Sequence, residues 1–221
     1  MATAALFWHP ISSRPIRGAQ LLALAGAMVA PLVLWPRSRT IRAASAAALI
    51  VPVVLLALPA REARVSTLRA SSVEQMQSFE GVRYVWGGEA RTGVDCSGLV
   101  RQGLLRAALR RGIRTLDGGL VRRAASIWWN DASARALAQG HLGQTRVVME
   151  AASLNSVATD RLLPGDFAVT RDGVHALAYV DGNRWISADP NLGGVATVRT
   201  PTDMRWFNVP VRIVRWRTLD S

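Results

Sequence analysis

The chain has 221 residues and a single cysteine, Cys96, with three histidines at His9, His141 and His175. A cysteine thiolate is a strong nucleophile, and it needs a nearby base such as an imidazole to take its proton. Cys96 follows Asp95 and precedes apolar residues spaced at the period of a helix, so we expect it in the first turn of a helix capped by that aspartate. Free N–H groups at a helix start stabilise a thiolate. We therefore expect a thiol pKa below about 7.5, against roughly 8.5 for a free thiol.

His175 is the best candidate for the base. His9 precedes the first apolar segment and is expected to be held away from the rest of the chain, while His141 lies in a glycine-flanked polar stretch typical of a surface. His175 opens a strand-like run, and the Asp-Gly-Asn turn at 181–183 predicts a hairpin that leads into a further strand at 184–188. A thiol at a helix start beside an imidazole on an antiparallel sheet is the papain-like arrangement.

Four stretches of the sequence, in the same order, resemble the NlpC-type cysteine peptidases, which are papain-like endopeptidases of bacterial cell walls. They are YVWGG at 84–88, DCSGLV at 95–100, LLPGD at 162–166 and HALAYVDGNRWI at 175–186. The resemblance implies an α+β fold in which a helix bearing the cysteine packs on an antiparallel sheet bearing the histidine. It also implies hydrolysis of an amide bond in peptidoglycan stem peptides through a thioester, without a cofactor or a metal.

The resemblance assigns roles to individual residues. Cys96 resembles the nucleophile and His175 the general base. Tyr84 resembles a tyrosine whose hydroxyl lies beside the thiol and helps to hold the oxyanion, for which the Cys96 backbone N–H is a second donor. The candidates for binding the substrate are Asp95, Ser97 and Trp86. For Asp95, a role as a helix cap alone is an equally open interpretation.

The third catalytic residue departs from the family pattern. The position twelve residues after the base, often a histidine in the family, is Ser187 here, and a hydroxyl orients an imidazole weakly. Asp189 lies two residues further on and so on the same face of the strand. We favour Asp189 as the group that orients His175, with Ser187 and Asn191 behind it. The alternative is that the Ala-Asp-Pro stretch at 188–190 only ends the strand in a turn.

Cys96 and His175 are 79 residues apart, which is further than the resemblance leads us to expect. The extra chain lies between about 112 and 160, with a helix expected over 121–140 and a second short element over 146–154. This insertion is expected to lie over or beside the cleft. Its adjacent Trp128 and Trp129 could line a substrate groove, or they could divide between core and surface.

Two apolar segments, 18–35 and 43–60, each run eighteen residues without a charge. About 17 to 25 apolar residues cross a bilayer as a helix, and internal prolines are tolerated there. We therefore expect a hairpin of two transmembrane helices, with two buried core helices or a signal peptide as the alternatives. The remaining chain is expected to form an N-terminal tail (1–17), a helical or flexible stalk (61–72) and a papain-like domain (73–221).

The net charge of +12 comes entirely from arginine, because the chain has no lysine. Residues 1–69 hold eight arginines and one acidic residue (+7), and residues 70–221 hold nineteen and fourteen (+5). A nucleic-acid reader is expected to concentrate its charge on the folded domain, so we expect no nucleic-acid partner and a lipid bilayer instead.

The side of the membrane on which the domain lies is left open by the charges. Three arginines lie in the loop between the apolar segments and five flank the segments on their outer sides. Because arginine is in excess on the cytoplasmic side of membrane proteins, these counts weakly favour a cytoplasmic domain. The resemblance implies the outer face of a bacterial inner membrane, where peptidoglycan lies. The alternatives to a cell-wall peptidase are a papain-like amidase or acyltransferase acting on another amide or lipid, and a catalytically silent binding module.

Overall fold

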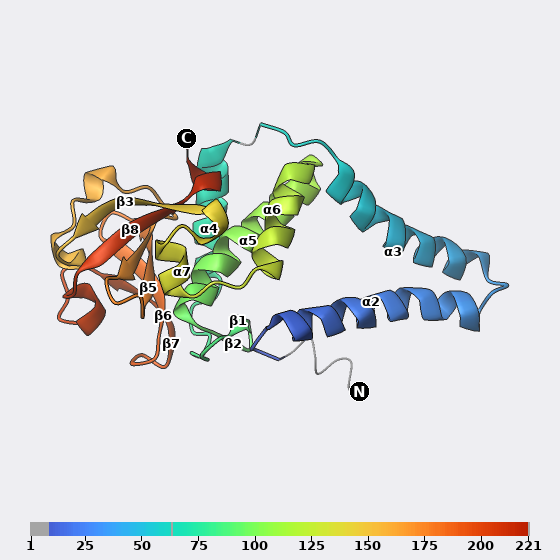
Figure 1. Cartoon of the computed structure of the whole chain (residues 1–221), viewed down its shortest axis with the longest axis horizontal. Helices are drawn as coiled ribbons and strands as arrows, with labels where there is room; N and C mark the ends of the chain where they lie inside the picture. Colours follow the sequence, from blue (N-terminus) through green and yellow to red (C-terminus); the bar gives the residue numbers. More distant parts are fainter. Residues whose placement is uncertain (1–8, 63, 221) are drawn as a thin grey trace.

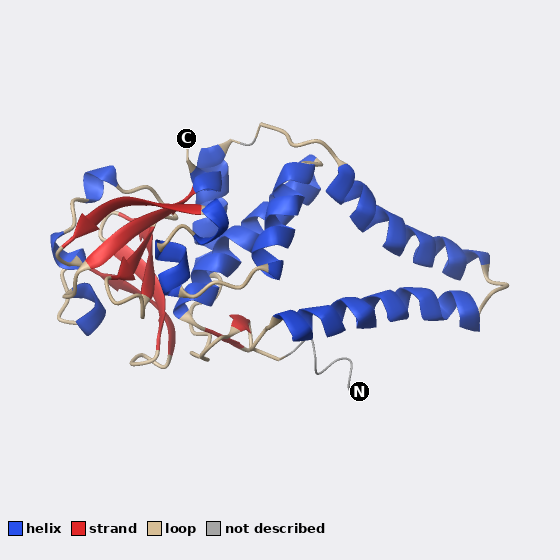
Figure 2. Ribbon diagram, viewed as in Figure 1, coloured by secondary structure: helices blue, strands red, loops and turns tan. Residues whose placement is uncertain are grey.

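The computed structural model describes residues 9–62 and 64–220, so residues 1–8 of the expected tail lie outside the described part (Figure 1). A six-stranded antiparallel sheet forms one side of the molecule, and three helices (α4, α5 and α6) lie beside it. Two long helices then project from this body as a hairpin (Figures 1 and 2). The predicted α+β class is confirmed.

The sheet has the strand order β3-β8-β4-β5-β6-β7 and contains the two predicted hairpins. Every neighbouring pair is antiparallel. The central strands β4, β5 and β6 follow one another in the sequence, with tight turns at 171–173 and 182–183 between them. The strands are β3 (Thr145–Ala151), β4 (Phe167–Thr170), β5 (Ala176–Asp181), β6 (Arg184–Asp189), β7 (Gly194–Arg199) and β8 (Val211–Trp216).

Helix α5 (Cys96–Thr115) packs on one face of β5 and β6 and is the central helix of the fold. Alternate residues of β5, Ala176, Ala178 and Val180, face this helix and form one core cluster with its buried leucines. The residues between them face the other side, where a second cluster contains Trp185 and Trp206. Burial on both faces explains why these strands are almost continuously apolar.

Helix α4 (Val65–Gln77) packs against α5 through Leu68, Val73 and Met76, which are all buried. The segment expected to be a stalk, 61–72, therefore contributes residues 65–72 to a helix of the folded body. Its polar composition concealed this packing because the small Ser72 and the charged Arg69 are among the buried residues.

The expected insertion, 112–160, forms α6 (Gly118–Trp129), the short α7 (Ala134–Ala138) and β3. The helix expected over 121–140 is thus two helices, broken at 130–133, where Ser133 caps the second one. The second expected element is β3, which pairs with β8 at the edge of the sheet.

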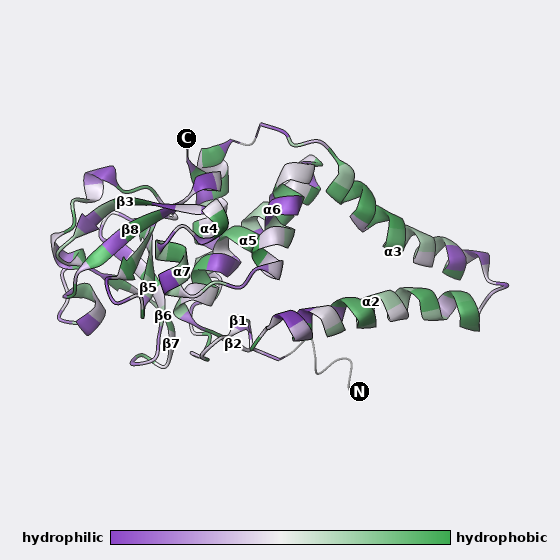
Figure 3. Cartoon of the chain, viewed as in Figure 1, coloured by the Kyte–Doolittle hydropathy of each residue, from purple (hydrophilic) through white to green (hydrophobic). Residues whose placement is uncertain are grey.

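The two apolar segments form α2 (Arg14–Leu34) and α3 (Arg39–Ala57), a hairpin of mainly apolar residues (Figure 3). The two helices lie close together near their connecting turn and diverge towards the folded body (Figure 1). Both helices begin four residues earlier than expected, because Pro15 lies in the first turn of α2 and Ser38 caps α3. The second ends at Ala57, just before Pro59. Both are long and apolar enough to cross a membrane, with mean hydropathies of 1.6 and 2.0, and few of their residues are buried in the protein.

Candidate active site

The start of α5 is built around Asp95, which caps the helix as expected. One oxygen of its carboxylate accepts hydrogen bonds from the Gly98 N–H (2.6 Å) and the Ser97 hydroxyl (2.9 Å). The other oxygen accepts from the Gly87 N–H at 2.8 Å. Asp95 thus joins the first turn of the helix to the preceding Trp-Gly-Gly loop. Gly98 must be a glycine, since a Cβ there would lie 2.3 Å from the Gly88 carbonyl oxygen.

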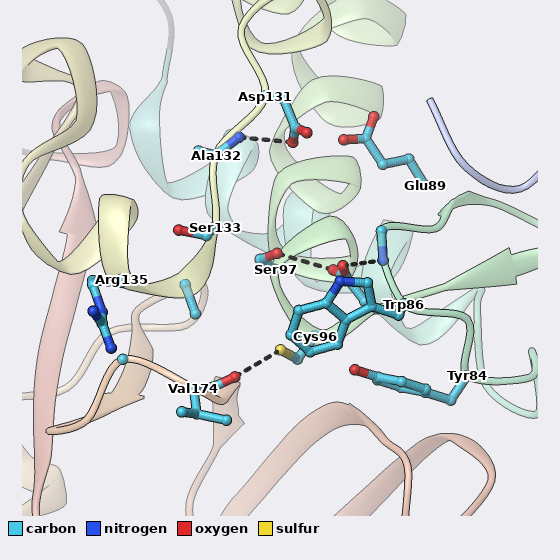
Figure 4. Close-up of a pocket in the computed structure, with 14 residues that line it drawn as sticks. Tyr84, Trp86, Glu89, Cys96, Ser97, Asp131, Ala132, Ser133, Arg135 and Val174 are labelled. Atoms are coloured by element: carbon cyan, nitrogen blue, oxygen red, sulfur yellow. Dashed lines mark hydrogen bonds between the residues drawn. The ribbon is translucent and has the colours of Figure 1, made fainter. Parts of the chain in front are cut away.

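A pocket of about 480 Å³ opens above Cys96 (Figure 4). The loop and helix start that carry Tyr84, Trp86, Asp95 and Ser97 form one side of it. The opposite side is formed by residues 131–135 of the insertion and by Gly173 and Val174, which precede β5. The insertion therefore lies beside the cleft, as expected.

The thiol of Cys96 is buried, with 6% of the residue exposed, and lies 3.9 Å from the Val174 carbonyl oxygen. Burial, and then the Asp95 carboxylate, raise its pKa to about 12, although the backbone N–H groups of Ala176, Ser97 and Cys96 itself act in the opposite direction. The expected pKa below 7.5 is therefore wrong for this state of the protein. The helix start does stabilise a thiolate, but the loss of water and the neighbouring carboxylate outweigh it.

His175 lies immediately before β5 and is held on three sides. Its backbone N–H donates to the Thr170 hydroxyl (3.0 Å) and its carbonyl accepts from the Thr170 N–H (3.0 Å). The imidazole stacks on Trp206, with 4.6 Å between the ring centroids and 17° between the planes. Burial lowers the pKa of His175 to about 4, an effect that the charges of Asp189 and Asp172 only partly offset. Near pH 7 both the thiol and the imidazole are consequently neutral.

Ser187, and not Asp189, is the residue that contacts the imidazole. The Ser187 hydroxyl lies 2.8 Å from Nε2 of His175. One oxygen of Asp189 accepts from the backbone N–H (2.8 Å) and the side-chain amide (3.1 Å) of Asn191, which ends β6 in a turn. The hydrogen bond therefore favours Ser187, and which of the two residues supports the base in catalysis stays a prediction. Asp189 is buried and close enough to raise the pKa of His175, but its hydrogen bonds close the turn at Ala-Asp-Pro.

Tyr84 lines the same pocket as Cys96. Burial, followed by the charges of Cys96, Asp95 and Asp189, raises its pKa to about 12. The phenol therefore keeps its proton at neutral pH and is available as a hydrogen-bond donor. The role of oxyanion donor that the resemblance implies for Tyr84 stays a prediction.

The candidates for binding the substrate differ in how exposed they are. Trp86 is 74% exposed at the mouth of the pocket, whereas Ser97 is 8% exposed and donates to Asp95. Trp128 and Trp129 do not line the Cys96 pocket, so the groove proposed for them is not where the thiol lies. Trp128 packs against the core beside α5, and Trp129 is 40% exposed, which is the division between core and surface that we gave as the alternative.

Sequence reasoning missed two acidic residues of the pocket wall, Glu89 and Asp131. Both interact with the buried Arg101, which projects from α5. Asp131 comes from the insertion, and nothing in its local sequence indicates this contact. Among residues 9–62 and 64–220, no three histidine, cysteine, aspartate or glutamate side chains are grouped so that they could hold a metal ion.

None of the three histidines is among the residues that line the pocket, although His175 directly follows Val174, which is. His141 is half-buried and not exposed as expected, and burial lowers its pKa. His9 is exposed, but the residues that follow it are not held away from the rest of the chain. The carbonyl of Pro10 accepts from the Glu89 N–H (2.8 Å), and Ile11 forms an isolated β-bridge with Gly88.

The sequence matches the model of the NlpC/P60 family over residues 81–214, which is more than half of the chain, and the protein belongs to this family. No curated protein is similar enough to match the chain.

Several solved structures are similar to this chain at low sequence identity. NlpC1 from Trichomonas vaginalis is 17% identical (TM-score 0.43), with 67% of this chain and 43% of that chain covered. The NlpC/P60 domain of the peptidoglycan hydrolase SagA is 20% identical (TM-score 0.38), with 66% and 97% covered. The P60 domain of antigen MAP1204 from M. avium subspecies paratuberculosis is 17% identical (TM-score 0.42), with 72% and 100% covered.

The depressed pKa of His175 predicts a pH-dependent stability. A histidine whose pKa falls from 6.5 to about 4 on folding contributes stability above pH 6.5 that is lost as the pH falls towards 4. The difference corresponds to about 3 kcal/mol in the free energy of unfolding. Chemical unfolding of the full chain, followed by tryptophan fluorescence between pH 7 and 4, measures it. In His175→Asn the same drop in pH should cost about 3 kcal/mol less, and equal losses in the two proteins would contradict the prediction.

Proposed function

We propose that this protein is a cysteine hydrolase that cleaves an amide bond in the stem peptides of peptidoglycan, and that α2 and α3 anchor it to a membrane. Membership of the NlpC/P60 family, in which peptidoglycan hydrolases are typical, supports the substrate class. The observation that carries the chemistry is the position of Cys96. It lies at a helix start, in a pocket, and its thiol contacts the backbone next to a histidine held by Ser187.

In the proposed mechanism, substrate binding brings the scissile carbonyl to Sγ of Cys96. Because the thiol and the imidazole are both neutral at rest, His175 takes the proton as the C–S bond forms. The negative charge moves to the carbonyl oxygen, which the Tyr84 hydroxyl and the Cys96 backbone N–H stabilise. Ser187 holds the imidazole ring in place during this transfer.

Collapse of the tetrahedral intermediate breaks the C–N bond, and the His175 imidazolium gives its proton to the departing amine. This leaves a thioester on Cys96. A water molecule, deprotonated by His175, then attacks the thioester carbonyl, and the C–S bond breaks to release the new carboxyl end. The Cys96 thiolate leaves and takes the proton back from the His175 imidazolium. The free amine end of a stem peptide would lie beside Asp95 and Ser97, which are the substrate-binding candidates together with Trp86.

The decisive experiment uses purified peptidoglycan and the full chain in detergent, with the released fragments identified by mass spectrometry. We expect soluble peptides with a new amine end and carboxyl end, and none with Cys96→Ala. If the wild-type protein binds peptidoglycan but releases nothing from it, the protein is the silent binding module instead.

The contact between Ser187 and the imidazole predicts the ranking of two variants. Ser187→Ala removes a hydrogen bond that orients the base, and a hydrogen bond of ordinary strength corresponds to a loss of about tenfold in kcat. Asp189→Asn keeps the side-chain oxygen that closes the turn and should cost less. Steady-state rates on a defined stem peptide measure both. A larger loss for Asp189→Asn would show that its charge, and not the Ser187 hydroxyl, supports the base.

We further propose that α2 and α3 both cross the membrane and that residues 64–220 lie on its outer face, where peptidoglycan is found. The length and apolar surface of the two helices support the first part, and the proposed substrate supports the second. A reporter fused after Ser221 tests the orientation, and activity solely in the cytoplasm would contradict it. That result would favour an amidase or acyltransferase acting on a lipid or another intracellular amide, which the arginine count also favours.

A further inference from the structure

The first turn of the apolar helix α2 is attached to the wall of the Cys96 pocket through a buried arginine. Arg17 is fully buried, and its guanidinium donates to Glu89 Oε2 at 2.8 Å and to the Trp129 carbonyl oxygen at 3.0 Å. Its third nitrogen, Nε, donates to the Ser12 hydroxyl at 2.9 Å. Charged side chains are rarely buried without such partners, so this contact defines how the start of the helix docks.

Glu89 is connected through Arg101 to Asp131 on the opposite side of the cleft. The other oxygen of Glu89 pairs with Arg101, which also binds Asp131 Oδ1 at 2.6 Å. The second guanidinium nitrogen of Arg101 donates to the carbonyls of Ile127 (2.7 Å) and Asn130 (3.1 Å). Figure 4 shows Glu89 and Asp131 together at one end of the pocket that holds Cys96. The charges alternate from α2 to the insertion, so each one is compensated by the next.

The backbone on both sides of this cluster is attached as well. Pro10 and Ile11, just before α2, pair with Gly88 and Glu89 in the loop that leads to Cys96. On the other side, Trp129 ends α6, and the chain then runs through Asp131 to Ser133 along the pocket. Arg17 therefore bridges the two segments that face each other across one end of the cleft.

The C-terminal end of α3, which is the other end of the hairpin in the sequence, makes its own hydrogen bonds to the folded body. Arg122 of α6 donates to the carbonyls of Leu56 (2.6 Å) and Leu58 (2.8 Å), and the Gly118 N–H donates to the Pro59 carbonyl (3.1 Å). The start of α2 and the end of α3 are thus both hydrogen-bonded to the folded body. Of these two attachments, the one at Arg17 involves a pocket-lining residue, Glu89.

We propose that Arg17 is a positioning residue that holds the 129–133 loop as a wall of the substrate cleft, so that the cleft is complete only while the apolar hairpin is docked. The part of this proposal that concerns the wall stands on geometry alone, and the part that concerns substrate rests on the proposed function. Because Arg17 does not line the pocket, its effect passes through Glu89 and the Trp129 carbonyl.

The test uses the full chain in detergent, with Arg17→Met and the matched control Arg14→Met. Arg14 lies one turn earlier on the same helix, is exposed, and donates a hydrogen bond of 3.5 Å to the Asn130 side chain. We expect Arg17→Met to raise hydrogen exchange over 129–133 and the rate at which a maleimide labels Cys96, each by about tenfold, because charge-assisted hydrogen bonds of that strength are lost. The control should change neither by more than about twofold.

On a defined stem peptide, Arg17→Met should raise KM by about tenfold with kcat little changed, since the wall contacts bound substrate and takes no part in proton transfer. Arg17→Lys keeps the buried charge and should restore exchange and labelling most of the way to the wild-type values, which guards against a general loss of fold. Unchanged exchange and labelling in Arg17→Met would overturn the proposal. If the wild type cleaves no peptidoglycan, the proposed function fails, while exchange and labelling still decide the role of Arg17.

Discussion

Replacing Cys96 with alanine is expected to abolish amide hydrolysis, with a loss on the order of 10⁴-fold or more in kcat, because no other thiol exists in the chain to form the thioester. The residue is small and buried at a helix start, so the variant should fold as the wild type does. Release of stem-peptide fragments measures the rate, and melting of the two proteins verifies the fold.

Cys96→Ser is the matched variant for this prediction, because it keeps the size and a hydroxyl but supplies a far weaker nucleophile at this site. It should be as inactive as the alanine variant. A rate within about tenfold of wild type in either protein would mean that the reaction does not pass through Cys96, and the proposed mechanism would be wrong.

Replacing His175 with asparagine is expected to lower kcat by about 10²- to 10⁴-fold, the usual range for general acid–base catalysis. The effect should be large because Cys96 is a neutral thiol at rest, with its pKa raised to about 12, and attack then requires a base at the moment of bond formation. Raising the pH should partly recover the rate of His175→Asn, as a larger fraction of the thiol ionises without help.

His141→Asn is the control for this variant, since His141 is half-buried and does not line the pocket. Its rate should stay within about twofold of wild type. Equal losses in the two histidine variants would assign the effect to stability, and a fully active His175→Asn would show that another group takes the proton from Cys96.

The pKa values of the pair also predict how activity depends on pH. In the wild type, a base with a pKa of about 4 stays unprotonated well below neutral pH, so acid inactivation of the free enzyme should occur nearer pH 4 than the ordinary histidine value of 6.5. Bound substrate would change the surroundings of His175 and so shift its pKa in the enzyme–substrate complex. The pH profile of kcat/KM reports the free protein and is therefore the one to compare.

Local sequence was sufficient to predict a candidate nucleophile, a candidate base and the elements that carry them. The cap at Asp95, the helical period after Cys96, and the turns before β5 and β6 are all local patterns, and each forms as expected. The apolar hairpin was evident for the same reason, because uncharged runs of that length are rare outside membranes and cores. Each of these features depends on residues a few positions apart in the chain.

Tertiary structure decided which groups meet. Ser187 and Asp189 lie on one face of β6, and only the position of His175 across the sheet selects the hydroxyl. The thiol pKa was misjudged because burial is a property of the whole fold and outweighs the local effect of the helix start. The contacts that lead from Arg17 through Glu89 to the insertion begin with a salt bridge between residues 72 positions apart. A salt bridge between such distant residues produces no periodic pattern in a single sequence. The sequence therefore determined the candidate reacting groups, while packing determined their protonation, the hydrogen-bond partner of the imidazole and the wall of the pocket.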